Sequence, residues 1–288
     1  MVNQGLPHNV QAAIDFKEQG NKYYKSGDYA RAEKLYTEAI NCDPKNHLLY
    51  TNRAMVLLKL NLHDRVIEDA IYAIRLHPLN MKAYFQLAQA QLALNSYQEA
   101  LHSAKMAHKF CMEEMYEGTK GANSIEPITE LVMKCKKMDW EARERKRETS
   151  RSKLFHEAQS GLIERRDKLI AELRNAGEEN VERIKEIEVE YDGMIEEFKR
   201  VWGMATGEKK REVPDWCIDD ITFSVMLDPV ITKTGQSYDK ASILKHLKRS
   251  ETDPLTREPL RPQDLRPNLA LRDACEEFLR ENGWAAEW

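Results

Sequence analysis

The sequence contains few cysteines and no long apolar run. Its five cysteines are spread over 288 residues without a C-x-x-C pair, which argues against a disulfide framework or a zinc site and favours a reducing compartment. No apolar stretch approaches the roughly 18 residues that a membrane-spanning helix needs, and the N-terminus does not read as a secretory signal. We therefore expect a soluble intracellular protein with no membrane role, located in the cytoplasm, with the nucleus as an additional location.

A strong charge of one sign is also missing. The net charge is −4, and the basic runs near 134–137 and 143–151 are interleaved with glutamate, so the sequence gives no support to nucleic-acid binding. Charged residues nevertheless make up 32 % of the chain, which indicates helices with large solvated faces. The length suits two or three domains.

Small residues recur in the first third of the chain at a spacing of 34 positions. The columns are Gly20, Ala54 and Ala88; Ala32, Val66 and Ala100; Ala39, Ala73 and Ala107; and Pro44 and Pro78. Small side chains let two helices approach closely, and proline ends a helix because it lacks an amide hydrogen. Each unit therefore predicts a pair of helices, in the first case 12–25 and 29–41.

This period and these small residues resemble the tetratricopeptide repeat. We expect a repeat domain over residues 10–126, with repeats at about 12–45, 46–79 and 80–113. Such helix pairs stack into a solenoid whose concave groove is lined by the first helix of each pair. Polar residues on those first helices are therefore candidates for binding a ligand.

Four of these polar residues suit a carboxylate ligand, because lysine supplies charge and amide groups supply directed donors. They are Lys17, Asn21, Asn52 and Lys82, and they resemble the carboxylate clamp of co-chaperone repeat domains. That resemblance implies binding of the acidic C-terminal tail of cytosolic heat-shock chaperones. Many clamps carry arginine where Gln86 stands, and we expect Gln86 to offer hydrogen bonds instead. The alternative is a set of ordinary exposed polar residues.

Residues 127–206 predict two long helices with a thin apolar stripe. The stripe follows heptad spacing through Phe155, Leu162, Leu169, Val181, Ile184, Tyr191, Ile195, Phe198 and Trp202. Gly177 interrupts it and can end a helix in the left-handed conformation. We predict an antiparallel coiled-coil hairpin with helices on the order of 70 Å and roughly 40 Å long, and a homodimer formed through it. The alternative is that the stripe packs only on other parts of its own chain.

Beyond a charged linker at 207–213, the pattern predicts a small α/β domain over residues 213–288. The segments 230–232 and 236–238 flank a turn and predict a β-hairpin. Asp239 and Asn268 are plausible N-caps of two helices.

The C-terminal region contains the short motifs I-T-F, D-P-V, Y-D, D-P-L-T and P-N-L-A. On these motifs it resembles the U-box, a RING-shaped domain without zinc. The resemblance implies that a ubiquitin-conjugating enzyme docks between two loops, and that catalysis works by proximity without a covalent ubiquitin intermediate. It assigns Arg257 the role of bridging the conjugating enzyme and ubiquitin. The expected docking residues are Ile221, Phe223, Met226, His246 and Pro254.

Each of these assignments has a simpler alternative. Ile221 and Phe223 could be core residues, Arg257 could be a solvated surface charge, and His246 suits a structural role. No metal or cofactor is expected.

Together the three regions give a mainly α-helical protein, with a tetratricopeptide solenoid, a long antiparallel helical hairpin and a small α/β U-box. This order resembles the co-chaperone ubiquitin ligases of the CHIP family. It implies a ligase that binds chaperone tails and a conjugating enzyme, and that acts on misfolded clients held by the chaperone. The alternative function is a non-enzymatic chaperone adaptor.

Overall fold

The computed structural model describes residues 9–116, 124–175, 181–206 and 211–288. The chain divides into two compact units, Met1–Trp140 with Val213–Trp288, and Glu141–Glu212. The expected turn at Gly177 and the first half of the linker at 207–210 lie outside the described residues.

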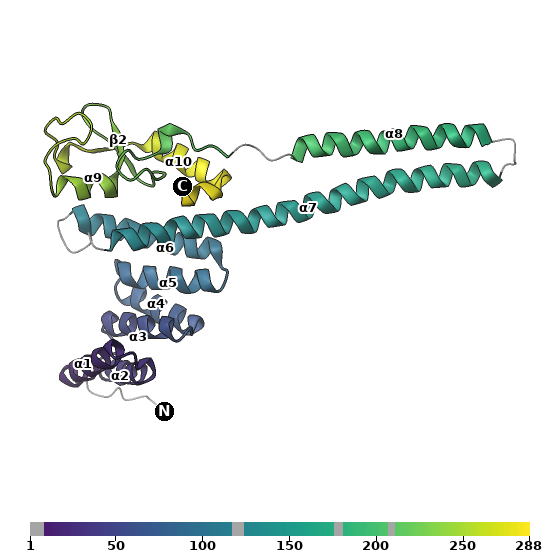
Figure 1. The fold of residues 1–288 in the computed structure, drawn as a ribbon. Helices are drawn as coiled ribbons and strands as arrows, with labels where there is room; N and C mark the ends of the chain where they lie inside the picture. Colours follow the sequence, from purple (N-terminus) through teal and green to yellow (C-terminus); the bar gives the residue numbers. More distant parts are fainter. Residues whose placement is uncertain (1–8, 117–123, 176–180, 207–210) are drawn as a thin grey trace. The chain divides into compact units, whose positions relative to one another are not determined.

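Six helices in three antiparallel pairs form the N-terminal solenoid (Figure 1). They are α1 (Val10–Lys25), α2 (Tyr29–Cys42), α3 (His47–Lys59), α4 (His63–Leu76), α5 (Met81–Ala93) and α6 (Tyr97–Tyr116). The side chains of Asn9, Asp28, Asn46 and Asn80 cap the starts of α1, α2, α3 and α5 by accepting backbone N–H bonds. The predicted helix pairs are therefore confirmed, and the ends of the two helices of the first pair differ from the predicted ends by at most two residues.

The 34-residue columns form the contacts between these helices. Ala32, Ala54, Ala73 and Ala107 are fully buried. At Gly20 a Cβ atom would lie only 3.0 Å from the ring of Tyr36, so the close approach of α1 and α2 requires glycine there. Small residues at these positions thus set the spacing at which the helix pairs stack.

The long helix α7 (Ile125–Asn175) begins as the last layer of the solenoid. Its first turns bury Leu131, Val132 and Cys135 against Ala100 and Ala104 of α6. Repeat arrays need an end helix of this kind to cover the apolar face of the final repeat.

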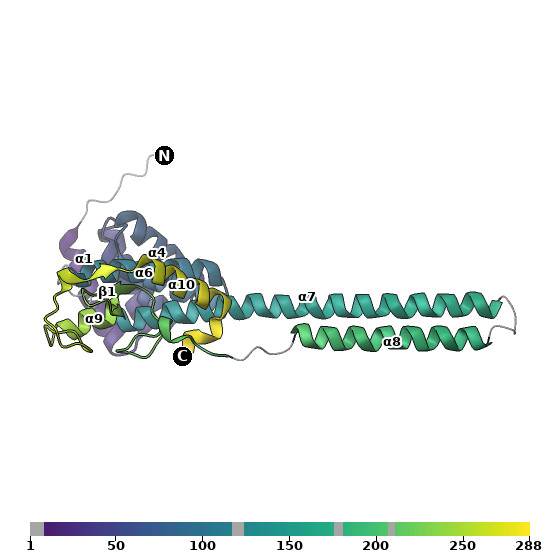
Figure 2. The same cartoon turned by 90° about the horizontal axis from the view of Figure 1, so that it is seen from above.

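The second unit is a helical hairpin made by the remainder of α7 and by α8 (Val181–Thr206), which run side by side (Figures 1 and 2). Phe155 of α7 stacks on Phe198, with ring centroids 5.3 Å apart, and also contacts Trp202. Arg166 pairs with Asp192 at 2.9 Å. Because residues later in α7 meet residues earlier in α8, the helices are antiparallel, as predicted. The apolar stripe is thus largely used within the hairpin.

The C-terminal domain has a small antiparallel sheet in the order β2-β1-β3. Its elements are η3 (Asp215–Cys217), β1 (Pro229–Ile231), β2 (Ser237–Asp239), α9 (Lys240–Leu247), η4 (Pro262–Asp264), β3 (Arg266–Pro267), α10 (Leu269–Glu281) and η5 (Gly283–Glu287). Val230 pairs with Tyr238 on one side and with Pro267 on the other. The hairpin and both capped helices were predicted, whereas β3 was not.

None of the five cysteines, all of which lie in the described ranges, forms a disulfide bond. Burial raises the pKa of Cys111 to about 11 and those of Cys135 and Cys275 to about 12. Cys217 is also buried and its pKa is raised, whereas Cys42 is partly exposed. Across the described ranges, no helix combines the length and apolar character needed to cross a bilayer. Within the same ranges, no cluster of three or more His, Cys, Asp or Glu side chains could hold a metal ion.

Candidate functional sites

The clamp residues lie on α1, α3 and α5, the first helices of the three pairs. Lys17, Asn21 and Asn52 are half-buried and Lys82 is exposed. The hydroxyl of Tyr36 donates to Oδ1 of Asn21 at 2.6 Å. This bond occupies the acceptor of the Asn21 amide and leaves its NH₂ group as the free donor, which is the polarity that a carboxylate ligand requires.

Gln86 forms a hydrogen bond between two helices of the solenoid. Its side chain is buried, and its Nε2 donates to the backbone carbonyl of Thr51 at 2.9 Å. The amide therefore ties α5 to α3. Its Oε1 atom has no hydrogen-bond partner among the described residues, but an acceptor cannot bind a carboxylate. One N–H of this amide is thus used inside the solenoid, which helical spacing does not reveal because it does not show which side chain the neighbouring helix covers.

Two loops in the C-terminal domain are built in the same way. Residues 218–225 close with the bridge Ile218–Val225, and residues 252–259 close with Thr252–Pro259. An aspartate lies second in each loop, and its carbonyl accepts the N–H of the residue four positions later. Those later residues are Phe223 and Arg257, which adopt the left-handed backbone region with φ of 58° and 61°.

A buried carboxylate holds each loop together. In the first loop, Oδ2 of Asp219 accepts the N–H and the hydroxyl of Thr222 at 2.9 and 2.7 Å. In the second loop, Oδ1 of Asp253 accepts the N–H groups of Leu255 and Thr256 at 2.9 and 3.0 Å. These hydrogen bonds determine the shape of each loop.

The left-handed residues present their side chains to solvent. Phe223 is 71 % exposed, and Arg257 is also exposed. Left-handed backbone is unfavourable for a residue with a Cβ atom and is maintained only where the surroundings impose it. The two loops therefore hold an aromatic ring and a guanidinium at the surface of the domain, outside its core.

Three other predicted docking residues are partly buried in or beside the two loops. Ile221 is half-buried and packs against a cluster that includes Val230 and Ile243, so it is partly core. Pro254 is half-buried in the second loop. The ring of His246 bonds through Nε2 to the carbonyl of Thr252 at 2.9 Å and thus supports the second loop.

Met226 is a correction to the predicted docking set. Only 2 % of its surface is exposed, and it packs with Cys217, Cys275 and Leu279. Its N–H donates to the carbonyl of Cys217, which turns the chain inward at the end of the first loop. The side chain therefore belongs to the core, although the sequence places it three residues after exposed Phe223.

Sequence reasoning missed Leu255 and the two loop aspartates. Leu255 is 54 % exposed and occupies the position in the second loop that Ile221 occupies in the first. The pattern D-x-x-T occurs at Asp219 and again at Asp253, and aspartate followed by threonine at this spacing is a local turn signal. A comparison of these two sequence motifs could have identified both loops.

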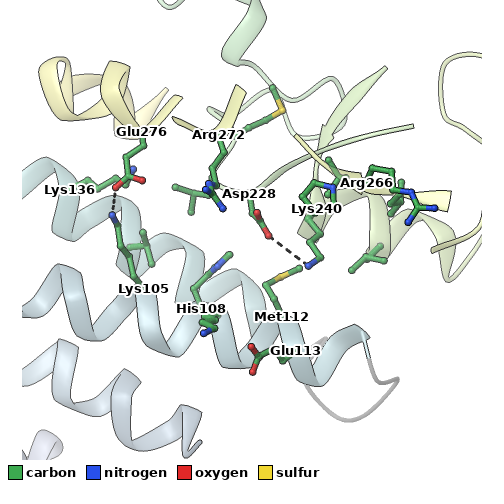
Figure 3. A pocket seen from close by; sticks show the side chains of 18 residues that line it. Lys105, His108, Met112, Glu113, Lys136, Asp228, Lys240, Arg266, Arg272 and Glu276 are labelled. Atoms are coloured by element: carbon green, nitrogen blue, oxygen red, sulfur yellow. Dashed lines mark hydrogen bonds and ion pairs between the residues drawn. The ribbon is translucent and has the colours of Figure 1, made fainter. Parts of the chain in front are cut away.

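A cavity of about 820 Å³ lies in the first unit and is lined by residues of α6, α7 and the C-terminal domain (Figure 3). Many of its charges are paired, Lys105 with Glu276 and Lys240 with Asp228. Burial lowers the pKa of His108 in its wall, which favours the neutral imidazole. Among the predicted site residues it includes only Met226, so neither candidate site opens into it.

The comparisons with known proteins agree with this division of the chain. The U-box domain family matches residues 213–284, and tetratricopeptide repeat families match residues 13–46 and 35–68. The repeat region is also 39 % identical over 104 residues to the Protein STIP1 homolog of Dictyostelium discoideum, covering 36 % of this chain and 18 % of that protein.

Solved structures similar to the repeats include two peptide complexes. The TPR2B domain of yeast Sti1 in a complex with an Hsp70 peptide is 30 % identical, with a TM-score of 0.40, and the match covers 43 % of this chain and 96 % of that one. The first repeat domain of Spaghetti (RPAP3), bound to the HSP90 peptide SRMEEVD, is 30 % identical with a TM-score of 0.37, covering 43 % and 95 %.

One relative extends over nearly the whole chain. The E3 ubiquitin-protein ligase CHIP of Arabidopsis thaliana is 30 % identical over 274 residues, which cover 93 % of this chain and 94 % of that protein. Both end domains and the intervening helices are therefore included in one match. With its repeats, its helical hairpin and its U-box in this order, the chain belongs to the CHIP family of E3 ubiquitin-protein ligases.

Proposed function

We propose that this protein is a co-chaperone ubiquitin ligase. Its repeats bind the acidic C-terminal tail of a heat-shock chaperone, and its U-box binds a ubiquitin-conjugating enzyme charged with ubiquitin. Ubiquitin then passes directly to a misfolded client that the chaperone carries. The observation that carries the proposal is the pair of similarly built loops, which present Phe223 and Arg257 to solvent in a chain of the CHIP family.

Transfer by proximity is consistent with the state of the thiols in the U-box. A nucleophilic cysteine needs access and a low pKa. Cys217 and Cys275 are buried, and burial raises both pKa values, so neither is prepared to accept ubiquitin. We assign Phe223 to docking of the conjugating enzyme, and Arg257 to orienting the bound ubiquitin for attack by a client lysine.

The clamp supplies the second part of the proposal. Lys17 and Lys82 offer charge to the terminal carboxylate of a chaperone tail, and the NH₂ group that Tyr36 orients on Asn21 offers a directed hydrogen bond. We propose further that the protein acts as a homodimer through the hairpin, and that it works in the cytoplasm.

Reconstitution with ubiquitin, activating enzyme, a panel of conjugating enzymes and a chaperone-bound client tests both parts. We expect Phe223→Ala to reduce chain formation by about tenfold or more, because exposed aromatic anchors dominate interfaces. Lys17→Ala should weaken binding of a chaperone-tail peptide about 10- to 100-fold, the effect of losing a charged hydrogen bond.

Two variants serve as matched controls. Leu269→Ala removes a similarly exposed apolar side chain from the start of α10, and Lys22→Ala removes an exposed lysine from another face of α1. Neither should change activity or tail affinity more than about twofold. Chaperone binding without chain formation by any conjugating enzyme would instead identify an adaptor. Full tail affinity in Lys17→Ala would remove the clamp.

A further inference from the structure

Two adjacent residues of β2 connect the two loops of the U-box. The hydroxyl of Tyr238 donates to Oδ1 of Asp253 in the second loop at 2.8 Å. The backbone N–H of Asp239 donates to Oδ1 of Asp219 in the first loop at 2.9 Å. A single stretch of strand thus bonds to the central carboxylate of both loops.

Tyr238 and Asp239 are themselves held in place by the surrounding structure. Tyr238 is fully buried, and its backbone lies in the sheet opposite Val230. The carboxylate of Asp239 accepts the N–H groups of Leu227, Asp228 and Ala241 at 2.8 to 3.0 Å. A group held by this many bonds can determine the distance between the two loops that it contacts.

The two bonds lead to different functional side chains. Asp219 is bonded through its carbonyl to the N–H of Phe223, and Asp253 is bonded in the same way to Arg257. Proximity catalysis needs both contacts at once, because the conjugating enzyme and its ubiquitin must be held in one orientation. The relative position of the loops therefore matters in addition to their individual shapes.

We propose that the Tyr238 hydroxyl is a positioning group for ubiquitin transfer, acting through Asp253 on the orientation of Arg257. This inference rests on the proposed ligase function. Removing the hydroxyl leaves Asp253 bonded to the N–H groups of Leu255 and Thr256, so the second loop keeps its turn. The loop loses its bond to β2, however, and Arg257 samples a wider range of positions. Phe223 is unaffected, because it is held through Asp219.

The test is single-turnover discharge of ubiquitin from a charged conjugating enzyme, measured over a range of concentrations of the full-length protein. Tyr238→Phe should lower the maximal discharge rate about 5- to 10-fold, because misorientation affects the reactive complex. Its half-saturating concentration should remain within about twofold of the wild type, because docking through Phe223 persists.

Two hydroxyl deletions give matched comparisons. Thr222→Val removes the hydroxyl that bonds to Asp219 in the first loop, and it should raise the half-saturating concentration more than it lowers the maximal rate. Thr234→Val removes a hydroxyl bond to Thr232 in the turn between β1 and β2, and it should change neither parameter.

A double-mutant cycle separates positioning from general loss of stability. If Tyr238 acts through Arg257, then Tyr238→Phe should reduce the rate of wild-type protein but not that of Arg257→Ala. Equal reductions in both backgrounds, or an unchanged maximal rate in Tyr238→Phe, would overturn the inference. Thermal unfolding of each variant confirms that the U-box is folded at the assay temperature. Absence of discharge by the wild type would reject the ligase proposal itself.

Discussion

At the scale of single residues, hydrogen-bonding partners decide which side chains remain free to act. The hydroxyl of Tyr36 bonds to Oδ1 of Asn21 and so fixes the orientation of its NH₂ group, whereas one N–H of Gln86 is used by the carbonyl of Thr51. Asn21 and Gln86 both carry amides on first helices of repeats, yet Asn21 is half-buried and Gln86 is buried. The difference arises from neighbours 15 and 35 positions away in the sequence, so helical spacing alone cannot predict it.

The surroundings of one histidine in the repeats, His47, also predict a dependence of stability on pH. His47 stacks on His77, with ring centroids 4.5 Å apart, and its Nδ1 lies 2.9 Å from the amide of Asn80. Burial, and secondarily His77, lower the pKa of His47 below its ordinary value of 6.5. The folded state therefore binds this proton less readily than the unfolded chain, and stability is lost as pH falls below about 6.5.

We expect His47→Gln to reduce the difference in unfolding free energy between pH 7.5 and pH 5.5. Glutamine cannot take up a proton in this range, and it keeps a polar group beside Asn80. Urea unfolding of the repeats, followed by pulse proteolysis at both pH values, measures the difference. His102→Gln, at an exposed site on α6, is the control. A pH difference as large in His47→Gln as in the wild type would contradict the assignment.

At the scale of elements, one ion pair joins three helices of the solenoid. Arg53 of α3 makes a bidentate pair with Asp69 of α4, at 2.8 and 2.7 Å, and donates to Thr37 of α2 at 3.1 Å. The side chains are 17 % and 7 % exposed, so little solvent screens the pair. In contrast, Arg65 of α4 and Glu33 of α2 form a pair in which the arginine is 46 % exposed.

Arg53→Met should lower the unfolding free energy by about 2 to 4 kcal/mol, because it leaves a buried carboxylate without its partner. Arg65→Met should lower it by less than about 1 kcal/mol, because exposed pairs contribute little. Urea titrations of both variants measure the two values. Equal losses would show that the buried pair has no special role in joining the first two repeats.

The sequence predicted elements better than it predicted side-chain contacts. The 34-residue period identified the solenoid, because small residues such as Ala54 and Ala73 recur at the equivalent helix contacts of each repeat. It did not reveal that Met226 turns inward, because a loop has no periodicity from which a face can be read. It also missed β3, because Arg266–Pro267 is too short for an alternating pattern and is defined by pairing with β1.

At the scale of the whole molecule, the hairpin has apolar residues that its own two helices do not cover. Ile187 and Ile195 are buried between α7 and α8, whereas Met194, Val201 and Met204 remain largely exposed. Positions 194 and 201 are seven residues apart and share one face of α8. The proposed homodimer would cover this face with a second hairpin.

We expect a mass of about twice the 33.5 kDa chain in light scattering at micromolar concentration. Met194→Glu combined with Val201→Glu should produce a monomer, because a dimer would bury two unpaired carboxylates per chain. Lys185→Glu adds negative charge on the opposite face of α8 and should leave the dimer intact. A monomeric wild type would refute the dimer proposal, while leaving ligase activity to be judged separately.

The burial of the thiols has a practical consequence for following this protein in solution. Four of its five cysteines are enclosed and Cys42, at the end of α2, is the partly open one. A thiol-reactive fluorophore should therefore react preferentially with Cys42, on the first repeat, while the protein is folded. The natural sequence thus provides a label position from which arrival of a chaperone tail can be observed, without engineering a new cysteine or deleting an old one.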